Sequence, residues 1–272
     1  MKPLEFTPIT EVTRPIDLTQ LRPDKLIGMR IREIERIKIN KGRDAVLVGD
    51  LFAVSGNNPN HIVFDAACST FERIGSGMQH GSIDIVGNAG ALTGFHMSGG
   101  AITITGDAGD FCANSMRGGL IRVGGSCGDY LASGLPGSKF SMNEGCVIVK
   151  GNAGERLGDR MRRGLIIVQG SAGGGACSSM IAGTVMLFGS VGDELGVHMK
   201  RGSILCAESL DLPSDRFVGQ PFAGDGYLTI FQKYLTEIGE PMDLYEKLGE
   251  PHVRFVGDLS HGGMGEIIRC GA

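Results

Sequence analysis

Five basic side chains recur at one place in a repeating pattern and are the best candidates for binding chemistry in this sequence. Each follows a methionine by one or two residues, and they are Arg117, Arg162, Arg163, Lys200 and Arg201. Clustered cations attract carboxylates and phosphates, and salt weakens that attraction. We therefore predict a basic corner that contacts an acidic partner or carrier. The alternative is a solvated edge, with Glu144 pairing locally to Arg117 or Arg163.

The other reactive residues form no catalytic pattern. His96 and His198 occupy matching positions but lie too many repeats apart to share a metal ion. The glycine-rich segment 170–175 lacks the strand-to-helix context of a phosphate-binding loop. Seven cysteines, none in a C-x-x-C pair, fall in different columns of the repeat and are expected to be small buried side chains. The sequence therefore predicts no catalytic residue and no metal site in this chain.

A repeat must position the basic side chains. It is marked by seven methionines in steps of 19 residues, with one step of 26, each followed three residues later by glycine: Met78, Met97, Met116, Met142, Met161, Met180 and Met199. Aliphatic residues then alternate with period two, which indicates a strand. The pattern predicts an all-β, right-handed parallel β-helix of about seven 19-residue coils, with the methionines inside. Asn88, Asp107 and Asn152 share a corner column, where we expect left-handed backbone.

The outward strand positions change character along the repeats. Early copies carry polar residues, whereas later copies carry an apolar outer ladder that consists of Ile148, Ile167, Met186 and Leu205. An exposed apolar patch of this length is typical of an interface. We predict that the ladder is a subunit interface and is covered by a partner. The alternative is cover by the chain's own C-terminal helix.

The repeats separate three predicted regions: an N-terminal arm and capping layer (1–77), the β-helix (78–207) and a partly helical tail (208–272). In the cap we expect a short helix over 24–36, interrupted near Gly28, a hairpin of strands 45–48 and 51–54, and a degenerate coil over 62–67. Phe64 precedes Ile83 by 19 residues, so we expect these two side chains to lie beside each other in successive coils. In the tail, spacing predicts a helix from Tyr227 to Ile238, a second over 243–248 and strands over 253–256 and 265–269. The long step of 26 contains a loop insertion over 129–141, which is either a binding feature or a tolerated surface loop.

Composition disfavours two classes of partner, nucleic acids and membranes. The net charge of −4 and the absence of tryptophan disfavour nucleic acid as a partner. The start of the chain lacks an apolar signal core, and no run of about 18 apolar residues occurs, so we expect a cytoplasmic protein without a membrane partner.

The repeated M-x-x-G-x-I-x-V-x-G-x-A-G pattern resembles the C subunit of formylmethanofuran dehydrogenase, which shares its β-helix with the C-terminal domain of the glutamate synthase large chain. The resemblance covers residues 50–206 and extends to Gly49-Asp50-Leu51-Phe52 and Val54-Ser55-Gly56. The tail from Phe217 to Ala272 is more similar to the gamma subunit (also called the C subunit) of the bacterial formyltransferase/hydrolase complex.

This resemblance implies a non-catalytic structural subunit in one-carbon metabolism. Amidohydrolase, formyltransferase and pterin-type subunits would hold the reaction centres, and formyl-methanofuran or formyl-methylofuran would give formate. The alternatives are the C subunit of an archaeal tungsten or molybdenum formylmethanofuran dehydrogenase that reduces CO2, and a glutamate-synthase-type scaffold domain. A free-standing enzyme is the weakest alternative. The chain itself would bind no cofactor, since metals and molybdopterin would lie in partner subunits. The polyglutamate tail of the methanofuran-type carrier would be a candidate ligand of the basic corner.

Overall fold

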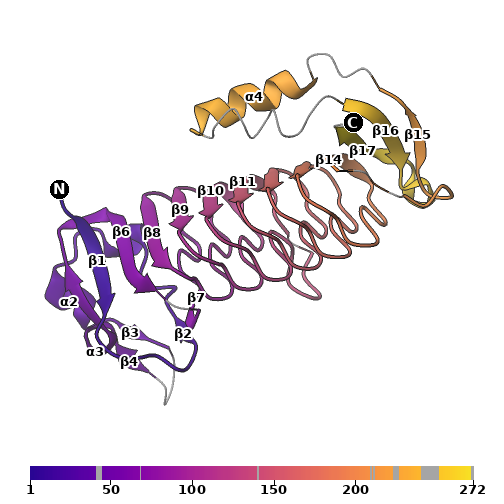
Figure 1. The fold of residues 1–272 in the computed structure, drawn as a ribbon. Helices are drawn as coiled ribbons and strands as arrows, with labels where there is room; N and C mark the ends of the chain where they lie inside the picture. The colour runs from indigo at the N-terminus through magenta and orange to yellow at the C-terminus, as the bar shows by residue number, and fades with distance from the viewer. Residues whose placement is uncertain are drawn as a thin grey trace.

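The structure is a computed structural model, and it describes residues 1–40, 45–67, 69–139, 141–208, 210, 212–222, 227–239 and 251–270. One sheet of 13 strands runs through most of it, in the order β15-β16-β17-β14-β13-β12-β11-β10-β9-β8-β6-β1-β5. The central strands are parallel, and Figure 1 shows them stacked side by side along an elongated body. The prediction of a mostly β protein with a large parallel sheet is confirmed.

Each repeat contributes one strand to this sheet. These strands are β8 (Ser82–Gly87), β9 (Ala101–Ile104), β10 (Arg117–Val123), β11 (Glu144–Val149), β12 (Leu165–Val168), β13 (Thr184–Leu187) and β14 (Arg201–Cys206). Their register places equivalent aliphatic residues beside one another, for example Ile83 beside Ile102. These inward side chains are fully buried, as the alternating pattern requires.

Each methionine of the repeat is also fully buried, and it packs onto the next repeat. A Cβ atom added to Gly100 would lie 2.5 Å from Cε of Met78, and one added to Gly183 would lie 2.9 Å from Cε of Met161. These two glycines have φ of 85° and 109°, which disfavours any side chain. The spacing of methionine and glycine therefore reflects a contact between successive repeats rather than within one repeat.

The segment before each methionine is a series of turns in which every second residue is left-handed. Leu92, Gly94 and His96 have φ of 59°, 71° and 55°. The N–H groups of Leu92 and His96 donate to the next repeat, at 2.9 and 3.0 Å, whereas the N–H of Gly94 donates to the preceding repeat at 2.9 Å. The sequence did not predict this pattern. Alanine, serine, phenylalanine and tyrosine also occupy it, because hydrogen bonds to both neighbours offset the backbone strain.

The corner column of Asn88, Asp107 and Asn152 has another role than expected. None of the three has positive φ. Instead, Asn88 Oδ1 accepts from the N–H of Asp107 at 2.9 Å, and Asn152 Oδ1 accepts from the N–H of Ser171 at 2.9 Å. The prediction of left-handed backbone there is wrong, since these side chains join successive repeats as hydrogen-bond acceptors.

The N-terminal region extends the sheet. The strand β1 (Pro3–Pro8) lies between β5 (Phe52–Ser55) and β6 (Asn58–Ala67), so the expected arm is a sheet strand. The interrupted helix is confirmed as α1 (Pro23–Leu26) and α2 (Ile31–Glu35). The remaining short elements are β2 (Ile16–Asp17) paired with β7 (Phe71–Glu72), β3 (Lys38–Ile39) paired with β4 (Val46–Leu47), and α3 (Val48–Leu51).

Two predictions for this region are wrong. The expected hairpin is absent from the described residues, because α3 separates β4 from β5 and the two strands join different sheets. Ile62, rather than Phe64, lies beside Ile83, so β6 and β8 are offset by 21 residues. Phe6, Phe52, Phe64 and Phe71 pack together, with ring centroids 5.1–6.3 Å apart between neighbours.

The C-terminal region ends the sheet and returns along it. The strands are β15 (Val218–Pro221), β16 (Pro251–Gly257) and β17 (Met264–Cys270), with a 3-10 turn, η2 (Leu259–His261), before β17. The predicted helix is α4 (Tyr227–Glu237), which lies beside the strand stack in Figure 1. The predicted helix over 243–248 falls outside the described residues. No helix in the described ranges is long and apolar enough to cross a membrane.

Candidate interaction surface

Four of the five basic residues line one surface pocket. Arg162, Arg163, Lys200 and Arg201 surround a depression of about 480 Å³, together with Asn143, Ile181, Ala182, His261 and Met264. The four cations are exposed, whereas Ile181 and Ala182 are half-buried. The structure thus brings the later members of the basic corner together over an apolar floor. We call this site the basic pocket.

The repeat determines the layout of the pocket. Arg162 and Arg163 closely precede β12, and Lys200 and Arg201 lie two repeats further on, at the start of β14. Ile181 and Ala182 occupy the same position in the intervening repeat. Neighbouring strands lie about 4.8 Å apart, so the two cation pairs are separated by roughly 10 Å.

The cations of the pocket lack acidic partners within the described ranges. Neither Arg162, Arg163, Lys200 nor Arg201 forms an ion pair with a carboxylate in that part of the chain. The pairing of Glu144 with Arg163, which belonged to the alternative of a solvated edge, is not observed there. A chain with a net charge of −4 thus presents a local cationic site.

Arg117 lies apart from the pocket. It begins β10. Partial burial lowers the pKa of His96, and the positive charge of Arg117 lowers it further by a smaller amount. His96 also contacts Phe95, with ring centroids 4.1 Å apart. The predicted corner is therefore divided into a four-residue pocket and a separate arginine beside His96.

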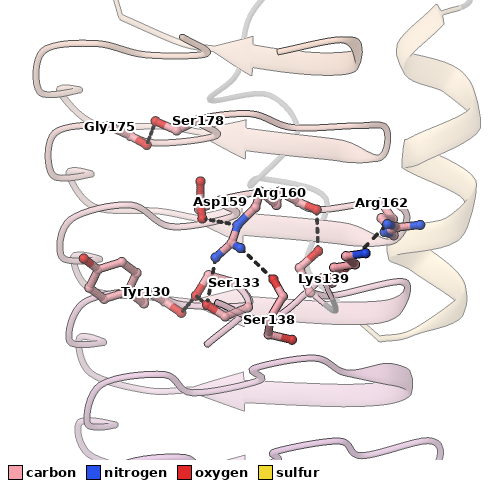
Figure 2. A network of polar contacts seen from close by, with 11 residues as sticks. Tyr130, Ser133, Ser138, Lys139, Asp159, Arg160, Arg162, Gly175 and Ser178 are labelled. Atoms are coloured by element: carbon pink, nitrogen blue, oxygen red, sulfur yellow. Dashed lines mark hydrogen bonds and ion pairs between the residues drawn. The ribbon is translucent and has the colours of Figure 1, made fainter. Parts of the chain in front are cut away.

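Arg160 organises the insertion over 129–141 (Figure 2). Its guanidinium donates to Asp159 Oδ2 at 2.7 Å and to the Ser138 carbonyl at 2.7 Å. The backbone carbonyl of Arg160 accepts from the Ser141 hydroxyl. Arg162, two residues on, donates to the Lys139 carbonyl at 3.5 Å, which places the insertion beside the basic pocket. Sequence reasoning missed Arg160, because it falls one residue before the methionine and outside the basic corner.

Asp258 supports the opposite side of the pocket. Its fully buried carboxylate accepts from the N–H of His198 and the N–H of Ser260, both at 2.9 Å. Burial acts to raise the pKa of Asp258, but these bonds, the Ser260 hydroxyl and the charge of Arg216 together hold that pKa below its ordinary value. His198 packs on His261 with ring centroids 4.5 Å apart, and His261 lines the pocket. The ring partner of His198 is thus His261 rather than His96, and the contact joins the turn before β14 to the end of η2, outside the repeat.

The apolar outer ladder is covered by the chain itself. Ile148, Ile167, Met186 and Leu205 are at most 1% exposed, and they form a cluster with Leu235 of α4. Other members of this cluster, or side chains packed against it, are Cys146, Leu165, Phe231, Ile238, Ile268 and Cys270. The prediction that these four positions form an exposed surface for a partner is therefore wrong for the described chain. The alternative, cover by the C-terminal helix, is observed.

The cysteines behave as packing residues. The six that the structure describes are buried free thiols, and burial raises the pKa of Cys177 and Cys206. Within the described ranges, no three His, Cys, Asp or Glu side chains are grouped so as to hold a metal ion.

Comparison with known proteins relates this architecture to two enzyme complexes. No family model matches the chain. The C subunit of tungsten-containing formylmethanofuran dehydrogenase 2 from Methanothermobacter thermautotrophicus is 31% identical over 99 residues, which are 35% of this chain and 37% of the relative. The C subunit of the formyltransferase/hydrolase complex Fhc from Methylorubrum extorquens is 32% identical over 75 residues, or 28% of each chain. The chain is a homologue of these C subunits.

The structural comparison extends over nearly the whole chain. A chain in the crystal structure of the formyltransferase/hydrolase complex (FhcABCD) from Methylorubrum extorquens, in complex with methylofuran, superposes with a TM-score of 0.86 and 27% identity. The superposition covers 98% of this chain and 100% of that one. The sequence matches span only about a third of the length of the curated relatives, whereas the structural match covers nearly the whole of both chains.

Proposed function

We propose that this chain is the C subunit of a formyltransferase/hydrolase-type complex and has a structural, non-catalytic role there. One observation carries the proposal: the chain superposes end to end on a chain of the FhcABCD complex, with a TM-score of 0.86. The match includes the C-terminal tail, the part of the sequence that resembles the bacterial subunit most.

The proposal includes the finer architecture. The repeats would wind as a right-handed parallel β-helix of about seven coils over 78–207, with 1–77 as its cap and 208–272 as its tail. Methionine–glycine contacts and side-chain ladders support a rigid rod of this kind. A rigid rod in the cytoplasm is suited to hold partner subunits at fixed separations.

The chemistry would belong to those partners. Amidohydrolase, formyltransferase and pterin-type subunits would carry the formyl group of a methanofuran-type carrier to formate. The basic pocket would contact an acidic group of the assembly, and the polyglutamate tail of such a carrier is one candidate. A second candidate function, the C subunit of a tungsten or molybdenum dehydrogenase, is favoured by the match to the Methanothermobacter subunit.

Native purification tests the proposal. A tagged chain is expressed in its own host, purified at low and moderate salt, and analysed by mass spectrometry together with tungsten and molybdenum determination. Amidohydrolase and formyltransferase chains without either metal are the expected result. Stoichiometric tungsten or molybdenum would select the dehydrogenase instead, and a chain that purifies alone under all conditions would contradict both.

A further inference from the structure

We propose that the basic pocket recognises an acidic protein segment in which an apolar side chain lies between two acidic ones. The inference rests on the proposed function only for the origin of that segment, a neighbouring subunit. The binding chemistry itself comes from the pocket, so the two claims can be tested separately.

The first argument is the order of residues along the stack. The arginine pair Arg162–Arg163 is followed one repeat later by Ile181–Ala182, and the pair Lys200–Arg201 follows after another repeat. Positive charge therefore lies on both sides of a half-buried apolar strip. A ligand that satisfies all three parts must be acidic, then apolar, then acidic.

The second argument is the cost of any simpler ligand. A purely apolar segment would bury four cations that have no carboxylate partner in the described chain, and burial of unpaired charge is costly. A purely acidic chain would pair the cations but would place charge over Ile181. The mixed segment avoids both costs.

The third argument is the rim. Met264 lies beside Arg201 in the sheet register and is 64% exposed, so its apolar side chain is accessible at this end of the pocket. At the other end, the insertion approaches Arg162 through the Lys139 carbonyl, held in place by Arg160. The pocket thus has an apolar end and a polar end, which would fix the direction of a bound segment.

The spacing indicates the sequence of the segment. The cation pairs lie roughly 10 Å apart, because two strand spacings separate them. An extended chain advances about 3.3 Å per residue. The side chains of an extended chain alternate between its two faces, so residues i, i+2 and i+4 face the same way. Acidic residues four positions apart, with leucine or a similar side chain midway between them, would therefore face both cation pairs and the floor together. They would span about 13 Å, and the long side chains of arginine, lysine and glutamate bridge the difference from roughly 10 Å.

Peptide binding tests the inference. Fluorescence anisotropy of the full chain would use labelled peptides of about eight residues with glutamates four positions apart and either leucine or serine midway between them, and a third peptide of glutamates alone. We expect the leucine peptide to bind about five- to tenfold more tightly than either other peptide. Its affinity should fall as salt rises from about 0.05 to 0.5 M.

Variants locate the site. Arg163→Glu combined with Arg201→Glu should abolish binding of the leucine peptide, and Ile181→Ser should remove its advantage over the serine peptide. Arg163→Lys with Arg201→Lys should retain binding, and Arg117→Glu is the matched charge reversal outside the pocket. Circular dichroism melts would confirm that each variant is folded.

Three results would overturn the inference: equal affinity for the leucine and serine peptides, equal affinity for the all-glutamate peptide, which would indicate a plain polyanion strip, or an equal loss of binding in Arg117→Glu. Peptide binding that persists when native purification yields no partner subunits would refute the proposed function and leave the inference standing.

Discussion

The outer face of the parallel sheet has two halves that share one backbone arrangement but carry different outward side chains. In β8, β9 and β10, one row of outward positions carries Asp84, Thr103 and Arg122, whereas from β11 to β14 the same row carries Ile148, Ile167, Met186 and Leu205. The inner face is aliphatic and buried in both halves. The inner side chains therefore determine the fold, and the outer ones determine what packs on it.

Arg122 lies at the boundary between the halves. Its guanidinium donates to the backbone carbonyl of Ile238, just after the end of α4. A cation at this position satisfies a carbonyl that the helix leaves unpaired and interacts favourably with the helix dipole. The helix thus covers the apolar half and ends where the polar half begins.

The largest expected effect comes from placing a charged side chain in the apolar half, as in the polar half. Ile167→Asp would place an unpaired carboxylate under α4, and we expect the free energy of unfolding to fall by about 4 kcal/mol. The helix should detach, because only its departure lets water reach the charge. Urea unfolding measures the first effect, and amide exchange of residues 227–237 measures the second.

The matched control is Thr103→Asp, in the same row of the polar half. It should change stability by less than about 0.5 kcal/mol and leave exchange of α4 unaffected. Equal losses in the two variants would show that the contrast between the halves has no energetic meaning.

The inner face should respond alike in both halves. Met161→Ala would remove a fully buried side chain and leave a cavity against the next repeat, at an expected cost of about 2–5 kcal/mol. Met97→Ala, in the polar half, should cost about the same. Chemical denaturation of both variants measures the difference, and a loss below about 1 kcal/mol in either would contradict the burial described.

The contact between repeats gives a finer test. Gly183→Ala should destabilise the protein, because φ is 109° and the added Cβ would lie 2.9 Å from Met161 Cε. Part of that loss should disappear in the Met161→Ala background, where the methyl group is absent. Strict additivity of the two losses would mean that the two residues do not contact each other.

The boundary residue should have a smaller effect. Arg122→Met keeps an apolar stem but removes the bond to Ile238, so we expect a loss of about 1 kcal/mol. Amide exchange should rise at the C-terminal turn of α4 and remain unchanged in β11 to β14. Uniform loss of protection along α4 would show that Arg122 stabilises the whole helix rather than only its C-terminal end.

The smallest effect concerns pH. The pKa of Asp258 is lowered in the folded protein, so the stabilisation is present above the ordinary value of 3.8 and is lost as pH falls through the lowered pKa. Asp258→Asn should therefore flatten the decline of stability below about pH 4. Thermal melts of both proteins between about pH 2.5 and 7 measure this, and parallel curves would contradict it.

Sequence periodicity predicted the sheet, the buried methionines and the existence of α4, because each depends on spacing within one element. It could not place α4, since an amphipathic helix can cover any apolar surface of suitable width. The register of β6 failed because the step of 19 was extended to a strand outside the repeat.

The site was predictable in part for the same reason. The clustering of the cations was predictable because they occupy matching positions of the repeat, and stacked repeats place matching positions side by side. Their partners were not: Arg160 acts through backbone carbonyls of an insertion, and His261 reaches the pocket through the pairing of β17 with β14. The left-handed turns were not predictable, because their residues share a conformation rather than a side-chain type.

The methionine–glycine contact has a consequence for the size of the molecule. Every methionine of the repeat fits under the glycine of the next repeat, and the last, Met199, fits under Gly265 of β17. At the other end, Pro23 of α1 occupies the place below Gly81 where a methionine would lie. Deletion of one complete repeat, whether of 19 residues or of the 26 residues that include the insertion, would rejoin a methionine to a glycine. A deletion that removes only part of the methionine–glycine register would separate them. The length of the stacked repeats can therefore change during evolution only in whole steps of about 4.8 Å, the spacing of neighbouring strands.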